Sequence, residues 1–275
     1  MTEECGILNL AVCIPEKIFD FFLNIINAPI QPLLDMVKSL LTEPISISLF
    51  NSLWAIMLYV ISLFYGLLLL YAGFNFMISG YDVVKRSKAK EWLRNILIMI
   101  ILVQASYFIY GAVIDLGSLL TVSIINLVDE SFFLLTADSI VNLGLQFFFA
   151  IFYVFALIFT TILLTIRYII VAVGVVFVPL GIFFYFIPPL QEYGKFIFNL
   201  LGICIFVTFF DALVFLVCSE LINIPLFANI KILVMIGAFT ISNLLMFYLM
   251  FFSIIKSALS IGKTVGIITI AKSLI

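Results

Sequence analysis

The stretch that decides the fold is residues 51–79, which read NSLWAIMLYVISLFYGLLLLYAGFNFMIS and contain no charged side chain. A bilayer core about 30 Å thick takes about 20 helical residues to cross, so this run is long enough to span a membrane. Its apolar residues are continuous rather than alternating, which favours a helix over a strand of a membrane barrel. We therefore expect a transmembrane helix over these residues.

The composition of the whole chain leads to the same class. Of its 275 residues, 65% are hydrophobic and 10% are charged, and the mean hydropathy is +1.36. So few charges cannot cover the surface of a soluble domain of this length. We therefore expect an all-α, polytopic integral membrane protein with about six transmembrane helices and amphipathic N-terminal helices, in the cell membrane.

Positive charge is concentrated directly after the first span. Five of the thirteen Lys and Arg residues lie within ten positions, namely Lys85, Arg86, Lys88, Lys90 and Arg94. Short loops rich in Lys and Arg stay on the cytoplasmic side, so loop 80–95 is predicted to be cytoplasmic and the N-terminus outside. The loop has two interpretations: a short helix on the cytoplasmic leaflet, or a docking surface for a cytoplasmic ATPase or for the phosphates of a nucleic acid.

Residues 1–50 are predicted to form an amphipathic segment on the outer membrane surface. They hold six acidic and two basic side chains, with apolar residues at helical spacing and breaks at Pro29, Pro32 and Pro44. This pattern indicates two short interfacial helices. The alternative is a first span over residues 7–30, which would bury three charged side chains in the membrane.

Residues 51–275 are predicted to form the transmembrane domain. A second span is expected over 93–114, followed by an interfacial or re-entrant helix at 116–128, because 13 residues are too few to cross. Residues 141–187 would be about 70 Å long as one helix, so we expect a hairpin that turns at Arg167. Two further spans are expected at 196–218 and 231–255.

This count leaves a conflict at the C-terminus. The hairpin would close on the outer side at Pro188 and Pro189, and the tail would then also lie outside. That tail carries Lys256, Lys263 and Lys272, and the charge rule disfavours such a placement. If Arg167 instead lies within a span and the hairpin turns elsewhere, or if residues 7–30 cross, the count changes by one for part of the chain.

The sequence offers little support for catalytic chemistry. It contains no histidine, the usual ligand of b-type haem and of most zinc sites. Gly262-Lys263-Thr264 is similar to the end of a phosphate-binding loop, but Ser257 stands where that motif needs glycine. We therefore expect no catalytic residue, metal or cofactor, and no enzyme. The four cysteines are expected to be inert, or Cys5 and Cys13 form a disulfide if they face an oxidising exterior.

Charged side chains inside the spans are further candidates for function. Asp211 lies in the sequence Phe-Phe-Asp-Ala-Leu, deep in a predicted span, where a lone carboxylate costs a few kcal/mol and usually faces a partner or a water-filled cavity. Arg167 is its expected partner. Alternatively, Asp211 is protonated, or satisfied by Thr208 or another polar neighbour, for helix packing alone. Candidates for interhelical hydrogen bonds are Asn75, Gln104 and Asn243.

Two stretches resemble a known family. Tyr71-Ala72-Gly73-Phe74, followed by SGYDVVKRSKAK from Ser79 to Lys90, is similar to the first cytoplasmic loop of TrbL-type polytopic subunits of conjugation and type IV secretion machines. A second stretch is similar to the middle of these proteins; it comprises Arg167-Tyr168, Pro179-Leu180 and Pro188. The resemblance covers roughly residues 15–220 and is strongest to the compact archaeal relatives of Ced-type DNA-import systems, which also lack a long soluble tail.

The resemblance implies a membrane channel or scaffold subunit of a DNA-transfer apparatus, which passes single-stranded DNA with energy from a separate cytoplasmic ATPase. Implied partners are that ATPase, other small membrane subunits or pilins, single-stranded DNA, the lipid bilayer and further copies of the chain. The five loop cations would receive the ATPase or the DNA, and Arg167 and Asp211 would lie in the subunit interior. Two other classes stay open on the sequence alone: a small-solute or ion transporter, and a structural subunit of another membrane complex.

Overall fold

The chain is an all-α, multi-pass membrane protein. The computed structural model describes residues 10–134, 143–228 and 230–273, which are almost entirely helical and contain no strand. Five of the described helices are long and apolar enough to cross a membrane: Ser48–Ile78, Val83–Ile125, Phe148–Phe186, Pro188–Ile222 and Lys231–Ile255. The fold class predicted from the composition is thus confirmed.

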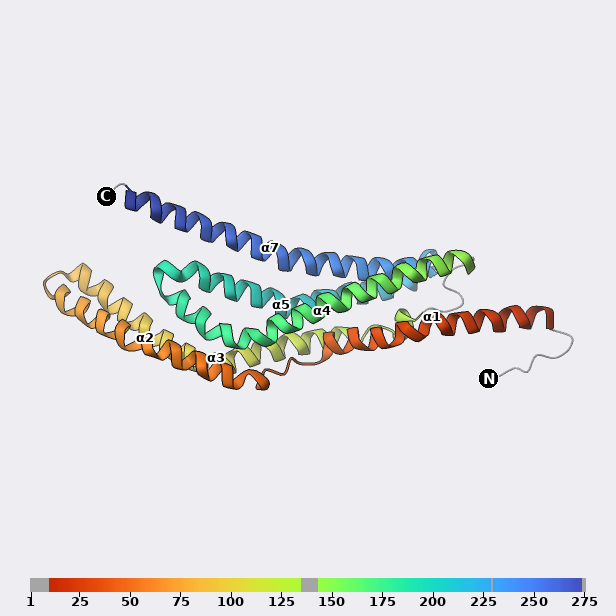
Figure 1. Cartoon of the computed structure of the whole chain (residues 1–275), viewed down its shortest axis with the longest axis horizontal. Coiled ribbons are helices and arrows are strands. Elements are labelled where there is room, and N and C mark those ends of the chain that lie inside the picture. Colours follow the sequence, from red (N-terminus) through yellow and green to blue (C-terminus); the bar gives the residue numbers. More distant parts are fainter. Residues whose placement is uncertain (1–9, 135–142, 229, 274–275) are drawn as a thin grey trace. The chain divides into compact units, whose positions relative to one another are not determined.

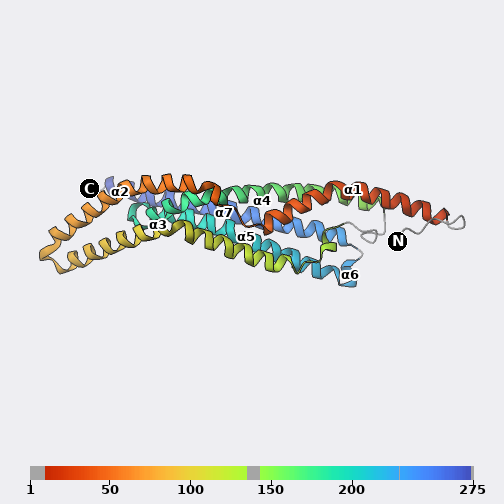
Figure 2. The same cartoon turned by 90° about the horizontal axis from the view of Figure 1, so that it is seen from below.

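The main elements in chain order are drawn in Figures 1 and 2. They are α1 (Leu10–Thr42), η1 (Ser48–Phe50), α2 (Asn51–Ile78), η2 (Ser79–Tyr81), α3 (Val83–Ile125), η3 (Glu130–Phe133), α4 (Leu143–Phe186), η5 (Pro188–Leu190), α5 (Gln191–Ile222), α6 (Pro225–Ala228) and α7 (Lys231–Ser273).

The chain divides into two compact units, which are described separately. Unit 1 comprises Met1–Glu43, Ser118–Ile166 and Thr208–Phe247, and unit 2 comprises Pro44–Gly117, Arg167–Val207 and Tyr248–Ile275. Each of the helices α3, α4, α5 and α7 contributes one segment to unit 1 and another to unit 2.

The core of unit 1 is an aromatic cluster centred on Phe239 of α7. Its ring centroid lies 4.8 Å from that of Phe215 on α5 and 5.6 Å from that of Tyr153 on α4. The Tyr153 hydroxyl donates a hydrogen bond of 2.9 Å to the backbone carbonyl of Phe133 in η3. This bond satisfies a buried hydroxyl and fixes η3 against α4, so four segments of unit 1 share one core.

Unit 2 contains a hairpin of α2 and the first part of α3, which lie side by side in Figures 1 and 2. The Trp54 indole donates a hydrogen bond of 3.0 Å to the Ser106 hydroxyl across the two helices. At the turn, an Asp82 carboxylate oxygen accepts hydrogen bonds from the backbone N–H groups of Val84, at 2.9 Å, and Lys85, at 3.2 Å. Asp82 therefore acts as the N-cap that starts α3.

A second hairpin in unit 2 joins the end of α4 to the start of α5 through η5 (Figure 1). Its helices approach closely at Gly194, where an added Cβ would lie 2.6 Å from both the Gly181 carbonyl oxygen and the Tyr185 backbone nitrogen. Small residues at such a crossing let two backbones come into contact, which is a common device in membrane helices. Gly194 is therefore required by the packing.

The predicted hairpin at Arg167 is wrong, because α4 runs without a break from Leu143 to Phe186. Its 44 residues span about 66 Å at 1.5 Å per residue, so part of the helix extends beyond a 30 Å hydrocarbon core. The prediction assumed that the Arg167 guanidinium must reach water at a turn. Instead, backbone carbonyls of α5 bind it, and the count of candidate spans among the described residues is five.

Two other predicted breaks are also wrong. The second span and the interfacial helix expected at 116–128 are one helix of 43 residues, α3. The N-terminal segment forms one helix, α1, where we expected two. Pro29 and Pro32 lie inside α1. A helix can contain a proline, because the loss of individual backbone hydrogen bonds can be accommodated by a bend rather than a break. No candidate span is found among the described residues of α1, and most side chains of the alternative span over residues 7–30 lie outside the described residues. The division into segments 1–50 and 51–275 stays a prediction.

Candidate functional site

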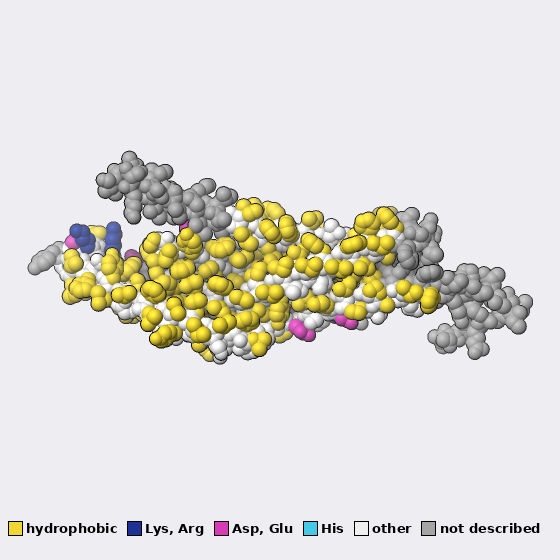
Figure 3. All heavy atoms as spheres, in the orientation of Figure 1, with side chains coloured by type: hydrophobic (Ala, Val, Ile, Leu, Met, Phe, Trp, Pro, Cys, Tyr) yellow, Lys and Arg dark blue, Asp and Glu magenta, His cyan; other side chains and the backbone are white. Residues whose placement is uncertain are grey.

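The five predicted cations lie at one end of the α2–α3 hairpin. All five are exposed and belong to the first turns of α3, so most of the predicted loop is helical. Figure 3 shows dark blue Lys and Arg side chains gathered at this end, beside a surface that is mainly hydrophobic. Residues 82–94 carry five cations and two carboxylates, which leaves a net charge of +3.

The helical register divides these cations into two sets. Arg86, Lys90 and Arg94 are spaced four residues apart on α3, so they lie on one face with a rise of about 6 Å between successive side chains; we call them the basic ladder. Lys85 and Lys88 lie on the side of α3 that borders a pocket, and we call them the pocket lysines.

Local acidic partners neutralise little of this charge. Lys85 Nζ lies 3.7 Å from Asp82, and Arg94 Nη2 lies 3.8 Å from Glu91, in pairs whose side chains are all largely solvent-exposed. Exposed pairs of this kind contribute about 0–1 kcal/mol. Lys88 and Lys90 form no ion pair with any described residue. Most of the positive charge thus remains accessible to a partner.

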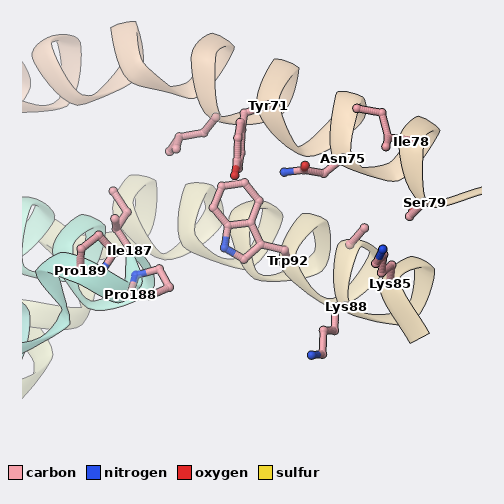
Figure 4. Close-up of a pocket in the computed structure, with 12 residues that line it drawn as sticks. Tyr71, Asn75, Ile78, Ser79, Lys85, Lys88, Trp92, Ile187, Pro188 and Pro189 are labelled. Carbon is pink, nitrogen blue, oxygen red and sulfur yellow. The ribbon is translucent and has the colours of Figure 1, made fainter. Parts of the chain in front are cut away.

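The pocket has a volume of about 730 Å³ and lies between the end of α2, the start of α3 and the α4–α5 turn. Figure 4 shows Tyr71 and Trp92 facing each other across the α2–α3 hairpin, with Pro188 and Pro189 beside them. We expected this proline turn on the opposite side of the membrane from the basic cluster. That expectation is wrong, because the prolines and the pocket lysines line one pocket. The reason is that α4 continues to Phe186 without the predicted reversal.

Arg167 is buried within unit 2, with 6% of its surface exposed. Its Nε donates a hydrogen bond of 2.6 Å to the Cys204 carbonyl, and its Nη2 donates one of 3.3 Å to the Ile205 carbonyl, both on α5. A charged group in a membrane span is costly unless polar groups surround it. The two carbonyl dipoles supply part of that environment and tie α4 to α5.

Asp211 is fully buried within unit 1. One of its carboxylate oxygens accepts a hydrogen bond of 2.7 Å from the Ser242 hydroxyl, which ties α5 to α7. Asn243, which follows Ser242 in the sequence, donates a hydrogen bond of 3.2 Å from its amide to the Ala156 carbonyl on α4. Sequence reasoning missed Ser242, because a single serine in an apolar span has no distinguishing signal.

The other sequence candidates have mixed outcomes. Arg167 and Asp211 belong to different units, so their predicted pairing stays a prediction. The Thr208 and Thr121 hydroxyls share one hydrogen bond of 3.2 Å, in which either can be the donor. Asn243 does bond between helices, as predicted, whereas Asn75 lines the pocket and Gln104 is exposed.

The described residues contain no group of three or more His, Cys, Asp or Glu side chains that could hold a metal ion. Cys204 and Cys218 are buried free thiols. The side chains of Cys5 and Cys13 lie outside the described residues, as do those of the stretch from Gly262 to Thr264. The candidate site is therefore the charged hairpin end of unit 2, and the buried Arg167 and Asp211 are separate candidates, one in each unit.

Comparisons with protein-family models, with curated proteins and with solved structures gave no match. The fold therefore defines the class, an all-α membrane protein with several spans, and the function is argued from the site.

Proposed function

We propose that this chain is a membrane channel or scaffold subunit of a DNA-transfer apparatus, related to conjugation and type IV secretion machines. In this proposal the chain guides single-stranded DNA, and a separate cytoplasmic ATPase supplies the energy, so the chain itself performs no catalytic step. Its further partners are other small membrane subunits or pilins and additional copies of the chain.

The observation that carries the proposal is the basic ladder. Three exposed cations on one helical face form a row about 12 Å long, which can contact several phosphates of a flexible single strand. Such contacts release counterions and therefore give salt-dependent affinity. The same row can attract an acidic surface of the ATPase.

The count of five spans supports a cytoplasmic position for the ladder. With an odd count, the α2–α3 turn, the α4–α5 turn and the residues after Ile255 all lie on one side. That side then carries nine of the thirteen Lys and Arg residues, namely the five of the hairpin, Lys195, Lys256, Lys263 and Lys272. The charge rule makes it the cytoplasmic side, with the N-terminus outside. The conflict over a basic tail outside the membrane does not arise in this arrangement.

The proposal is tested by marker transfer between cells that carry R86Q/K90Q/R94Q. We expect transfer to be lost while the protein is inserted at its normal level, because the ladder no longer attracts its partner. The matched control is R86K/R94K, which keeps all three charges and should keep transfer. Normal transfer by the glutamine variant at normal protein levels would contradict the proposal. A topology reporter on each variant detects inversion of the chain, since these charges also set orientation.

Binding of a labelled single-stranded oligonucleotide to the full chain in nanodiscs distinguishes between DNA and the ATPase as the partner of the ladder. If DNA is the partner, affinity falls as salt rises, and the glutamine variant lowers the slope of log K against log salt by about 2 for three lost phosphate contacts. If the oligonucleotide does not bind although the variant abolishes transfer, the ladder docks the ATPase.

A further inference from the structure

The pocket beside the pocket lysines is too large and too apolar to be a simple gap in the packing. Its volume of about 730 Å³ lies within the usual size of small-molecule sites, about 300–1,000 Å³. Most of its wall is apolar, from Leu68 and Ile78 on α2 and from Ile187 to Pro189 at the α4–α5 turn. Water alone is a poor occupant of such a wall, because it gains few hydrogen bonds there.

The pocket is lined by an aromatic pair of the kind that is common at the polar boundary of a membrane. The Tyr71 and Trp92 rings pack edge to face with centroids 5.1 Å apart, and Figure 4 shows both in the space between α2 and α3. Trp and Tyr are enriched at the level of lipid headgroups, where one part of the ring is apolar and another can bond to polar groups. A pocket with this pair suits a lipid headgroup and the start of its acyl chains.

The polar groups of the pocket suit an anion. Lys85 and Lys88 come from the first two turns of α3, and Lys88 lies one helical turn before Trp92. The Asn75 side chain extends from α2 into the same space in Figure 4 and can donate hydrogen bonds through its amide. No carboxylate lines the pocket, so the lining has two positive charges and no negative one.

From this combination we infer that the pocket binds one anionic phospholipid. The headgroup phosphate lies at the pocket lysines, and the acyl chains lie along the apolar wall formed by α2 and the α4–α5 turn. A soluble phosphate would not use the apolar wall, and a neutral lipid would not use two cations. Basic pockets between membrane helices bind anionic headgroups in the same way.

Lipid binding in the pocket does not depend on a role in DNA transfer, and it gives the two sets of cations different partners. The pocket lysines bind lipid and hold the hairpin against the α4–α5 turn. The basic ladder, on another face of α3, stays accessible to DNA or the ATPase. Loss of the lipid site therefore leaves oligonucleotide binding by the ladder intact, so the two proposals fail separately.

Tryptophan fluorescence provides the test, because the chain contains only Trp54 and Trp92. W54F leaves Trp92, inside the pocket, as the single reporter. The full chain is placed in phosphatidylcholine vesicles that contain equal fractions of either brominated phosphatidylglycerol or brominated phosphatidylcholine, both of which quench nearby tryptophan. We expect stronger quenching of Trp92 by the anionic lipid.

Adding K85Q/K88Q should abolish this difference, whereas K90Q/R94Q removes the same charge from the ladder and should preserve it. Equal quenching by the two lipids, or a difference that survives K85Q/K88Q, would overturn the inference. An equal loss in both double variants would also overturn it, because it would indicate diffuse attraction to the helix. If W54F does not insert, the same comparison uses the difference between the wild-type chain and W92F.

Discussion

At the scale of single residues, the buried charges are each held by the neighbouring helix. Arg167 on α4 donates to two carbonyls of α5, and Asp211 on α5 accepts from Ser242 on α7. In an apolar interior these bonds replace water, so each charged group fixes the position of the helix beside it. Both residues therefore act on packing.

Arg167→Lys should lower the thermal unfolding midpoint of the purified protein in detergent. Lysine keeps the charge, but its compact ammonium cannot reproduce the planar donors that reach the Cys204 and Ile205 carbonyls at once. Circular dichroism at rising temperature measures the midpoint. The control is Arg94→Lys, whose site is largely exposed and should show no change. Equal midpoints for wild type and Arg167→Lys would refute the bridging role.

Ser242→Ala should destabilise unit 1 by about 1–3 kcal/mol, because it removes the donor to one oxygen of a buried carboxylate. Unfolding in mixed detergent measures the loss, and the exposed Ser123→Ala serves as the matched control. The same substitution in an Asp211→Asn background should cost less, since the buried charge is then absent. If the two costs are equal, Ser242 does not act through Asp211.

At the scale of elements, the α4–α5 hairpin depends on a close backbone contact. Gly194→Ala should lower the unfolding midpoint, because its Cβ would meet backbone atoms of Gly181 and Tyr185 that cannot move aside. Gly202 lies on the same helix, and a Cβ added there would have no atom within 4 Å. Gly202→Ala should therefore leave the midpoint unchanged or raise it. Equal behaviour of the two variants would show that the contact is unimportant.

Some of the helices could be predicted from the sequence and others could not. Long apolar runs predicted α2, most of α5 and the spanning part of α7, because the length of a span is a local property. The continuity of α4 could not be predicted, since it depends on carbonyls of α5 that bind Arg167. The basic cluster was visible in the sequence, but its division into ladder and pocket lysines needed the register of α3 and the position of the α4–α5 turn.

At the scale of the whole molecule, five spans predict that the chain ends on the same side as the basic hairpin. A reporter fused after Ile275 should therefore respond like one inserted at the α2–α3 turn, and unlike one fused to the N-terminus. Paired fluorescent and secreted-phosphatase reporters measure this in cells. A C-terminal reporter on the side of the N-terminus would contradict the five-span topology and restore an even count.

The central claim is that the chain belongs to a DNA-transfer apparatus. Its most direct test is marker transfer between cells after the gene is deleted separately in donor and in recipient. We predict that transfer is lost in one role only, that the wild-type gene restores it, and that the R86Q/K90Q/R94Q gene does not. Transfer that is unchanged by deletion in both donor and recipient would contradict the claim.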